Sequence, residues 1–156
     1  MTKEELNGFS YRITQASRTE LIVIMYDMAQ TYLKDAMQAY QKNDEEFRLG
    51  LKRAQRVVNE LSSSLDMQYD ISIELFRLYL YMNKTINEAS LKKDATNIPV
   101  VQKMLAGLRS SFEILSKKDQ SGAMMRNTQQ VYAGLTYSNG GLNETMDPGA
   151  NRGFTV

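Results

Sequence analysis

The chain contains neither cysteine nor histidine in its 156 residues. Without cysteine it has no disulfide framework, no thiolate nucleophile and no cysteine-ligated zinc site. Without histidine it lacks the commonest general base, the commonest metal ligand and any phosphohistidine relay. Neither standard spacing of a glycine-rich phosphate-binding loop occurs. This composition argues against an enzyme, and we expect no catalytic residue, no metal site and no cofactor.

The chain also lacks a strong net charge and long apolar runs. Its formal net charge is +1, which gives no reason to expect nucleic acid or an acidic membrane as a partner. No apolar run approaches the roughly 20 residues of a membrane-spanning helix, and the N-terminus lacks the apolar stretch of a signal peptide. We therefore expect one cytoplasmic domain that does not insert into a membrane.

Four segments have the apolar periodicity of α-helices. Ser17 and Glu20 have the spacing of a capping box, which predicts the start of the first helix. Asn43 is the expected cap of the second helix, and Asn97, followed by Pro99, is the expected start of the fourth. The predicted helices cover residues 18–40, 45–65, 71–92 and 98–117. Four such helices with short connections predict an all-α, antiparallel up-down four-helix bundle.

The two ends of the chain differ from these helical segments. We expect residues 1–16 to form an N-terminal arm and residues 17–119 to form the bundle domain. Beyond residue 119 the chain is rich in glycine, asparagine, serine and threonine, which are typical of turns and loops. For residues 120–156 the sequence predicts one short helix, around residues 123–133, followed by a flexible tail.

Two of the predicted helices have more apolar residues than one buried stripe requires. Residues 21–26 are all apolar or aromatic, so they occupy every side of the first helix. The third helix carries further large apolar side chains outside its main stripe, among them Ile73, Phe76, Leu80 and Tyr81. Because an amphipathic helix buries one stripe, the surplus is either sandwiched within the domain or offered to a partner. Both interpretations remain open for Tyr26 and Tyr79.

Adjacent carboxylates are the main enzyme-like feature of the chain. Glu4-Glu5 and Glu45-Glu46 are sequence neighbours, so within a helix their side chains diverge by about 100°. A di-metal carboxylate bundle would also need histidine on facing helices. We therefore interpret these pairs as parts of solvated helix faces.

Short motifs lie in order along the chain. Gln15–Leu21 has the sequence QASRTEL, and Met25–Ala29 has MYDMA. Ser64–Asp66 has SLD, Leu78–Met82 has LYLYM, and Glu88–Asp94 has EASLKKD. In this order and at these separations, they resemble the motifs T-A-S-P-E-E-L, L-Y-D-G-A, s-L-D, L-Y-d-Y-M and e-A-n-x-k-k-D of the flagellar secretion chaperone FliS family. The departures from that pattern include Arg18 for proline, Met28 for glycine and Leu80 for aspartate.

The resemblance implies a cytoplasmic, ATP-independent chaperone. Chaperones of this family bind the disordered C-terminal segment of flagellin in apolar helical grooves, which prevents premature polymerisation. They also assist delivery of flagellin to the export apparatus through its component FlhA. A co-chaperone or an anti-sigma factor is a further expected partner. A segment that orders on binding needs a large apolar surface, which agrees with the surplus on two helices.

The expected groove draws on the stripes of the first, third and fourth predicted helices. Its predicted lining residues are Ile22, Tyr26, Ile71, Leu75, Tyr79, Met82, Ile86, Met104 and Leu108. Phe9 and Tyr11 in the N-terminal arm form a candidate lid. In the tail, Met125, Gln129 and Val131 are candidates for a segment that folds back and occupies the groove in cis. The alternative is a non-catalytic interaction or regulatory bundle whose apolar faces form a homodimer.

Overall fold

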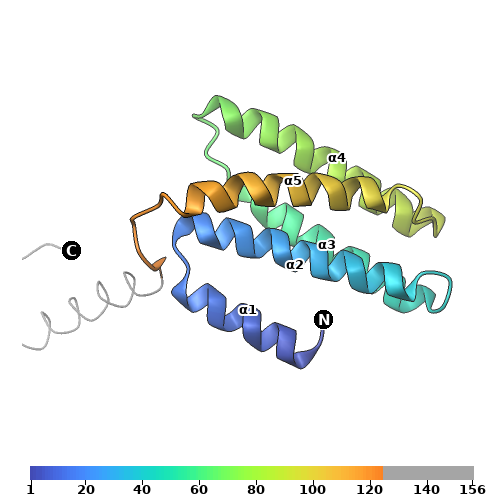
Figure 1. The fold of residues 1–156 in the computed structure, drawn as a ribbon. Coiled ribbons are helices and arrows are strands. Elements are labelled where there is room, and N and C mark those ends of the chain that lie inside the picture. The colour runs from blue at the N-terminus through green and yellow to red at the C-terminus, as the bar shows by residue number, and fades with distance from the viewer. Residues whose placement is uncertain (125–156) are drawn as a thin grey trace, which may run out of the picture.

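Five α-helices account for most of residues 1–124, the part of the chain that this computed structural model describes. They are α1 (Lys3–Gln15), α2 (Arg18–Ala39), α3 (Asp44–Ser63), α4 (Asp70–Lys92) and α5 (Ile98–Ser116). Helices α2 to α5 run in alternating directions and form the bundle in Figure 1, which confirms the predicted all-α bundle. The expected tail, with most of its short helix, lies outside the described residues.

The predicted helix boundaries hold to within two residues, and two of the three predicted capping residues, Ser17 and Asn43, cap their helices. The Ser17 hydroxyl accepts a hydrogen bond from the Glu20 N–H (3.2 Å), and the Glu20 carboxylate accepts one from the Ser17 N–H (3.4 Å). The Asn43 side chain caps α3 by accepting bonds from its first N–H groups. Asn97 is the exception, because its side chain makes no capping hydrogen bond and α5 begins beside Pro99 without one.

The segment expected to be an N-terminal arm is helix α1. Thr2 and Glu5 form a capping box of the same type as Ser17 and Glu20, with hydrogen bonds of 3.1 and 2.7 Å. Phe9 then packs with Ala16 and Ile24, which holds the helix against α2. The Thr2–Glu5 spacing is visible in the sequence. It was missed because α1 has only a narrow apolar stripe behind it.

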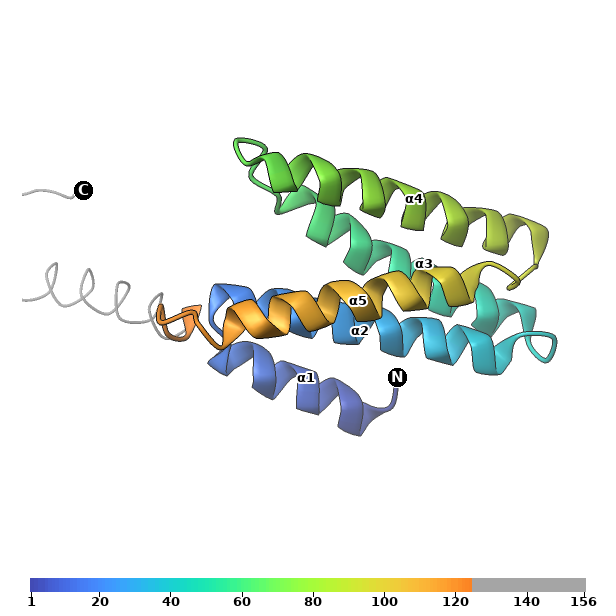
Figure 2. The same cartoon turned by 45° about the horizontal axis from the view of Figure 1, so that its top comes forward.

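Helix α2 lies at the centre of the fold. It packs against α3 and α5, and α1 lies along another of its sides (Figures 1 and 2). Its buried residues are Val23, Ile24, Tyr26, Ala29, Leu33 and Ala36. They serve different neighbours, since Ile24 clusters with Phe9 of α1 while the Tyr26 ring lies 5.7 Å from that of Phe112 in α5. Most of the apolar surplus of α2 is therefore covered within the chain.

Tyr26 and Tyr79 join α2 to α4 through the core. Both side chains are buried, and their hydroxyl oxygens share a hydrogen bond of 2.5 Å. Burial raises the pKa of both phenol groups, because the charged form would lose its hydration. Both residues are therefore part of the core of the described chain.

A glycine allows α2 and α3 to approach closely. A Cβ atom at Gly50 would lie 2.8 Å from the Cβ and 2.9 Å from the backbone N of Ala36. We expect Gly50→Ala to push the two helices apart and to cost about 1–3 kcal/mol of unfolding free energy in urea denaturation. Gly107 of α5 is the matched control, since a Cβ there meets nothing within 4 Å. Gly107→Ala should stabilise the fold by about 0.5–1 kcal/mol. Stabilisation by both substitutions would contradict the close contact.

The tyrosine pair predicts loss of stability in alkali. The folded pKa of each phenol is raised, so its contribution is complete below the unfolded pKa of about 10 and is lost as pH rises above it. We expect the unfolding free energy of the native chain to fall more steeply between pH 9 and 11, as roughly placed by that pKa, than that of the double variant Tyr26→Phe/Tyr79→Phe. Each single variant leaves a buried hydroxyl without its partner. The double variant should therefore lose less unfolding free energy than the two single variants lose in sum. Equal pH slopes and additive losses would contradict a buried, hydrogen-bonded tyrosine pair.

Candidate partner-binding surface

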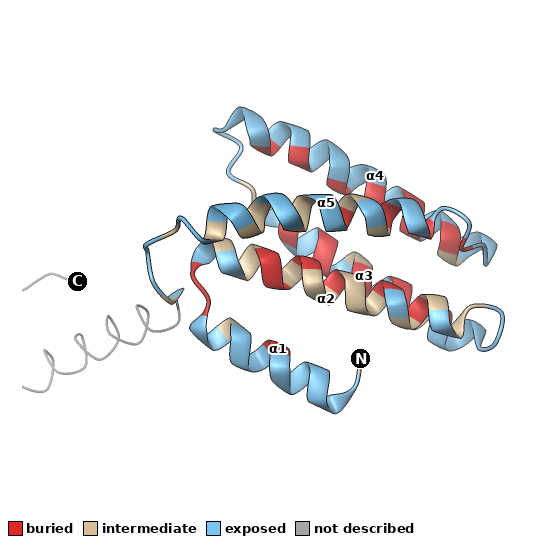
Figure 3. Ribbon diagram, in the orientation of Figure 1, coloured by how far each residue is buried: buried red, intermediate tan, exposed pale blue. Residues whose placement is uncertain are grey.

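Helix α4 carries a row of exposed apolar side chains that the rest of the described chain does not cover. Its outer side is largely exposed in Figure 3. Six large apolar residues of its first half are between 36% and 65% exposed. These six define the α4 apolar surface: Ile71, Ile73, Phe76, Leu78, Leu80 and Tyr81. Exposed apolar side chains gathered on one element indicate an interaction site more strongly than scattered ones do.

The α4 apolar surface has one flank beside α3. The buried stripe of α4 includes Leu75 and Tyr79. At 100° per residue, Ile73, Phe76 and Leu80 lie together on one side of that stripe. Asn83 belongs to the same side, and its side-chain amide donates a 2.7 Å hydrogen bond to the Asn59 side chain of α3. The flank is therefore a strip along the outer edge of the α3–α4 pair.

The other flank lies at an open end between α4 and α5. Ile71, Leu78 and Tyr81 fall on the opposite side of the buried stripe. The two helices meet at their short connection and separate toward the opposite end of the bundle (Figures 1 and 2). There, Leu115 continues the stripe of Val101 and Leu105, yet it is 51% exposed. This end therefore leaves apolar positions of both helices accessible.

The charges of α4 are balanced. The helix contains three acidic residues, Asp70, Glu74 and Glu88, and three basic ones. Glu74 and Arg77 form an exposed ion pair of 3.2 Å. The surface therefore offers apolar contact without a strong charge of either sign, and it suits a partner segment of low net charge.

Of the nine residues predicted to line the groove, five are buried in the structure and four are partly buried or exposed. Tyr26, Leu75, Tyr79, Met82 and Ile86 come together in one buried core cluster. Ile22, Met104 and Leu108 are partly buried against that cluster, and Ile71 is 65% exposed. The stripe spacing thus selected mainly core positions, whereas four of the six exposed residues of the α4 apolar surface lie at surplus positions beside the stripe: Ile73, Phe76, Leu80 and Tyr81. Those surplus positions are the sequence signal for this surface.

Helix α1, with the candidate lid residues, lies on a different side of the molecule. Phe9 is 9% exposed and packs with Ile24, whereas Tyr11 is 70% exposed. Arg12 pairs with Asp27 of α2 (2.8 Å), and Asp27 also binds Arg109 of α5. That hydrogen bond raises the pKa of the Arg109 guanidinium. Asp27 therefore links α1, α2 and α5 beside a pocket of about 280 Å³, which they line together.

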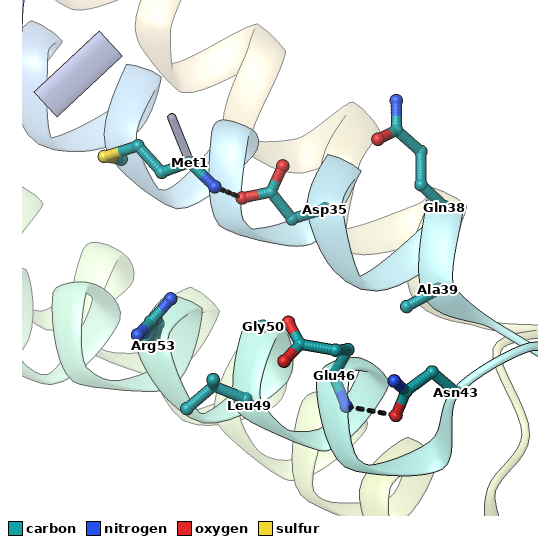
Figure 4. Close-up of a pocket in the computed structure, with 9 residues that line it drawn as sticks. All are labelled: Met1, Asp35, Gln38, Ala39, Asn43, Glu46, Leu49, Gly50 and Arg53. Atoms are coloured by element: carbon teal, nitrogen blue, oxygen red, sulfur yellow. Dashed lines mark hydrogen bonds and ion pairs between the residues drawn. The ribbon is translucent and has the colours of Figure 1, made fainter. Parts of the chain in front are cut away.

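A polar pocket of about 370 Å³ lies between the end of α2 and the start of α3. Figure 4 shows its lining, in which the Met1 amino group pairs with Asp35 and Asn43 caps α3 beside Glu46. The Met1–Asp35 pair connects the N-terminus to α2, and the Asn43 bond belongs to the cap of α3. Within residues 1–124, no group of three or more acidic side chains is arranged to hold a metal ion. No helix in this part of the chain is long and apolar enough to cross a membrane.

Most of the described chain is similar in sequence to known proteins. Residues 3–119, from the start of α1 to just past α5, match the family model described as "Flagellar protein FliS". The chain is also 24% identical over 115 residues to the flagellar secretion chaperone FliS of Bacillus subtilis (strain 168). That similarity covers 71% of this chain and 86% of the relative. The matched residues include the whole bundle and α1, so this chain belongs to the FliS family of flagellar export chaperones.

Proposed function

We propose that this protein is a cytoplasmic chaperone that binds the disordered C-terminal segment of flagellin on the α4 apolar surface. The observation that carries the proposal is the row of six exposed apolar side chains on α4, next to the open end where Leu115 is accessible. Membership of the FliS family supplies the functional context. In this proposal the chaperone keeps the client segment from other flagellin copies and delivers it to the export component FlhA.

The spacing of the surface suits an amphipathic client helix. Ile73, Phe76 and Leu80 recur at intervals of three and four residues, so they form a straight strip along α4. A client helix could lay its own apolar stripe along this strip, as in other helix-in-groove complexes. Ordering a disordered segment costs conformational entropy, and burial of apolar area from both partners offsets that cost.

The predicted groove residues take two roles in this proposal. Ile71 contacts the client directly, and Leu108 does so at the open end. The buried members, such as Tyr79 and Met82, hold α4 against α2 and α3 and so keep its outer flanks in position. Ile22 and Met104 remain partly buried and contribute to the rim of the core. The function needs no catalytic residue, cofactor, nucleic acid or membrane insertion, and a co-chaperone or anti-sigma factor would share the apolar surface.

Helix α1 acts as a lid in the same proposal. It covers Ile24 through Phe9, and outside this small cluster its polar link to the bundle includes the Arg12–Asp27 ion pair. A client segment longer than α4 would continue past the open end onto α2 and α5 once α1 moved aside. The lid would then lower the apparent affinity of the closed chaperone for its client.

The α4 apolar surface also favours a second candidate, a regulatory bundle that pairs through α4 as a homodimer. A homodimer would place the same six residues against their copies around a two-fold axis. Size-exclusion chromatography with light scattering separates the two functions. The chaperone proposal expects a monomer that forms a one-to-one complex with the flagellin peptide. A dimer that the peptide cannot dissociate would favour the alternative.

Substitutions in the α4 apolar surface should weaken client binding. We expect Ile71→Asp and Ile73→Asp each to reduce affinity for a peptide of the flagellin C-terminal segment at least about fivefold, because the new carboxylate loses hydration at the interface. Isothermal titration calorimetry measures the affinity, and urea denaturation checks that each variant is folded.

The matched control is Leu91→Asp. Leu91 is on the same helix and is 73% exposed, but it lies about 30 Å from Ile71 along the axis. It should retain native affinity. If all three variants bind equally well, or if the native chain fails to bind at micromolar concentration, the proposal is wrong.

Two neighbouring positions in α1 test the lid. Phe9→Ala removes the buried anchor, whereas Tyr11→Ala removes a side chain that is 70% exposed. We expect Phe9→Ala to speed amide hydrogen exchange in α1 and to raise peptide affinity severalfold, and Tyr11→Ala to change neither. Faster exchange in α1 with unchanged affinity would contradict the lid.

A further inference from the structure

Three exposed basic side chains lie just beyond the α3-side flank of α4, which ends at Leu80. Lys84 is four residues after Leu80, so it lies on the same side of α4 one turn further along. Lys52 and Arg56 are also four residues apart, and both are exposed on one side of α3. These three residues, Lys52, Arg56 and Lys84, define the basic site.

Hydrogen bonds between α3 and α4 place the members of the basic site beside one another. The Gln55 side chain donates a 3.2 Å bond to the Asn83 carbonyl, and the Asn83 side-chain amide donates a 2.7 Å bond to the Asn59 side chain. The two helices are antiparallel neighbours (Figure 2), so Arg56 of α3 and Lys84 of α4 lie at about the same level. The basic site therefore spans both helices just past the end of the apolar flank.

The charges of the basic site are not neutralised by ion pairs within the described chain. Elsewhere, Arg12, Arg77, Lys93 and Arg109 each pair with a carboxylate. No ion pair among residues 1–124 involves a member of the basic site, although α3 and α4 carry exposed glutamates one turn away. The three cations are therefore available to an anionic group of a partner.

The opposite end of the flank is acidic. Asp66 lies in the connection from α3 to α4, and Asp70 is the first residue of α4, three residues before Ile73. Both aspartates are exposed. A helix has a partial positive charge at its N-terminus and a partial negative charge at its C-terminus, to which a free terminal carboxylate adds. A partner helix on this flank is therefore favoured with its C-terminus at the basic site, parallel to α4.

The distance between the two ends suits a short helix. Lys84 is eleven residues after Ile73, which corresponds to about 16 Å along the helix axis or about three turns. The apolar stripe of a partner helix of this length would contact the flank, and its last residue would reach the level of Arg56 and Lys84. Apolar contact then supplies most of the affinity, whereas the charges set the direction.

We propose that the basic site binds the C-terminal carboxylate of the client segment and thereby fixes its direction, parallel to α4. The guanidinium group of Arg56 presents several N–H donors to the carboxylate, and the ammonium groups of Lys52 and Lys84 add positive charge around it. The identity of the client rests on the proposed function. The recognised end of the client and its direction rest on the charge pattern of α3 and α4.

Two forms of the flagellin C-terminal peptide test recognition of the carboxylate, one with a free and one with an amidated C-terminus. We expect the native full-length chain to bind the free form at least about threefold more tightly in isothermal titration calorimetry, because amidation removes the charge that faces the basic site. The preference should shrink as salt is added, since the site is exposed. Equal affinity for the two forms at low salt would overturn the proposal.

Charge-removing variants locate the preference on the molecule. Both positions of Lys52→Gln/Arg56→Gln are exposed, so the fold should be retained, which urea denaturation checks. We expect this variant to bind both peptide forms as weakly as the native chain binds the amidated form. The matched control is Lys117→Gln/Lys118→Gln, which removes two exposed charges after α5, at the opposite end of the bundle. A preference that survives in the first variant, or that is lost only in the control, would overturn the proposal.

A spin label on the peptide tests the direction. The peptide carries a nitroxide on a cysteine placed about three turns before its C-terminus, and the chaperone has no cysteine of its own. We expect strong broadening of the methyl NMR signals of Ile73 and a sharp signal for Leu91, which lies about 27 Å farther along α4. Broadening of Leu91 with a sharp Ile73 would show the reverse direction and overturn the proposal.

The peptide titrations separate carboxylate recognition from the proposed function. Equal and tight binding of both peptide forms by the native chain leaves the proposed function standing and removes the recognition of the carboxylate. Failure of the native chain to bind either form at micromolar concentration removes both.

Discussion

The enclosure of α2 is the constraint on which the other features depend. Its apolar residues face several directions, so α1, α3 and α5 must all pack around it. This leaves α4 with α3 along its length and with α5 mainly near their connection. The Tyr26–Tyr79 hydrogen bond attaches α4 to α2 through the core, but it does not close the open end. The uneven closure of the bundle is what leaves the flanks of α4 accessible.

Helices α2 and α4 both have more apolar residues than one buried stripe requires. The structure covers the extra apolar side chains of α2 but leaves several of those of α4 exposed. The surplus of α2 is covered by Phe9 of α1 and Phe112 of α5, whereas Ile73 and Leu80 of α4 remain exposed. Periodicity and capping residues were enough to predict the four bundle helices. They could not predict which surplus is covered, because that depends on how neighbours are placed in space. Helix α1, which provides part of the cover, was itself missed.

For the candidate site, the sequence predicted that α4 takes part but not which of its apolar residues are exposed. The nine predicted groove residues lie on the stripes of α2, α4 and α5, and a stripe at intervals of three and four is the pattern that a core selects. Only Ile71, where the helices have separated, is largely exposed among those nine residues. Ile73, Phe76, Leu80 and Tyr81 were recognisable in the sequence as surplus apolar residues. The sequence pattern does not show that α4 and α5 separate toward one end of the bundle, and that separation is what exposes Ile71. The family resemblance indicated a chaperone, but it did not indicate which residues form the exposed apolar surface.

This member of the FliS family combines a core that encloses α2 with an α4 helix whose flanking apolar side chains are exposed. Methyl NMR during titration with the flagellin C-terminal peptide tests whether the client binds the α4 apolar surface. We expect the signals of Ile71, Ile73 and Leu80 to shift to saturation while those of the buried Leu33 and Val58 stay in place. Shifts confined to the α1–α2 side, with the α4 signals unchanged at saturation, would contradict it.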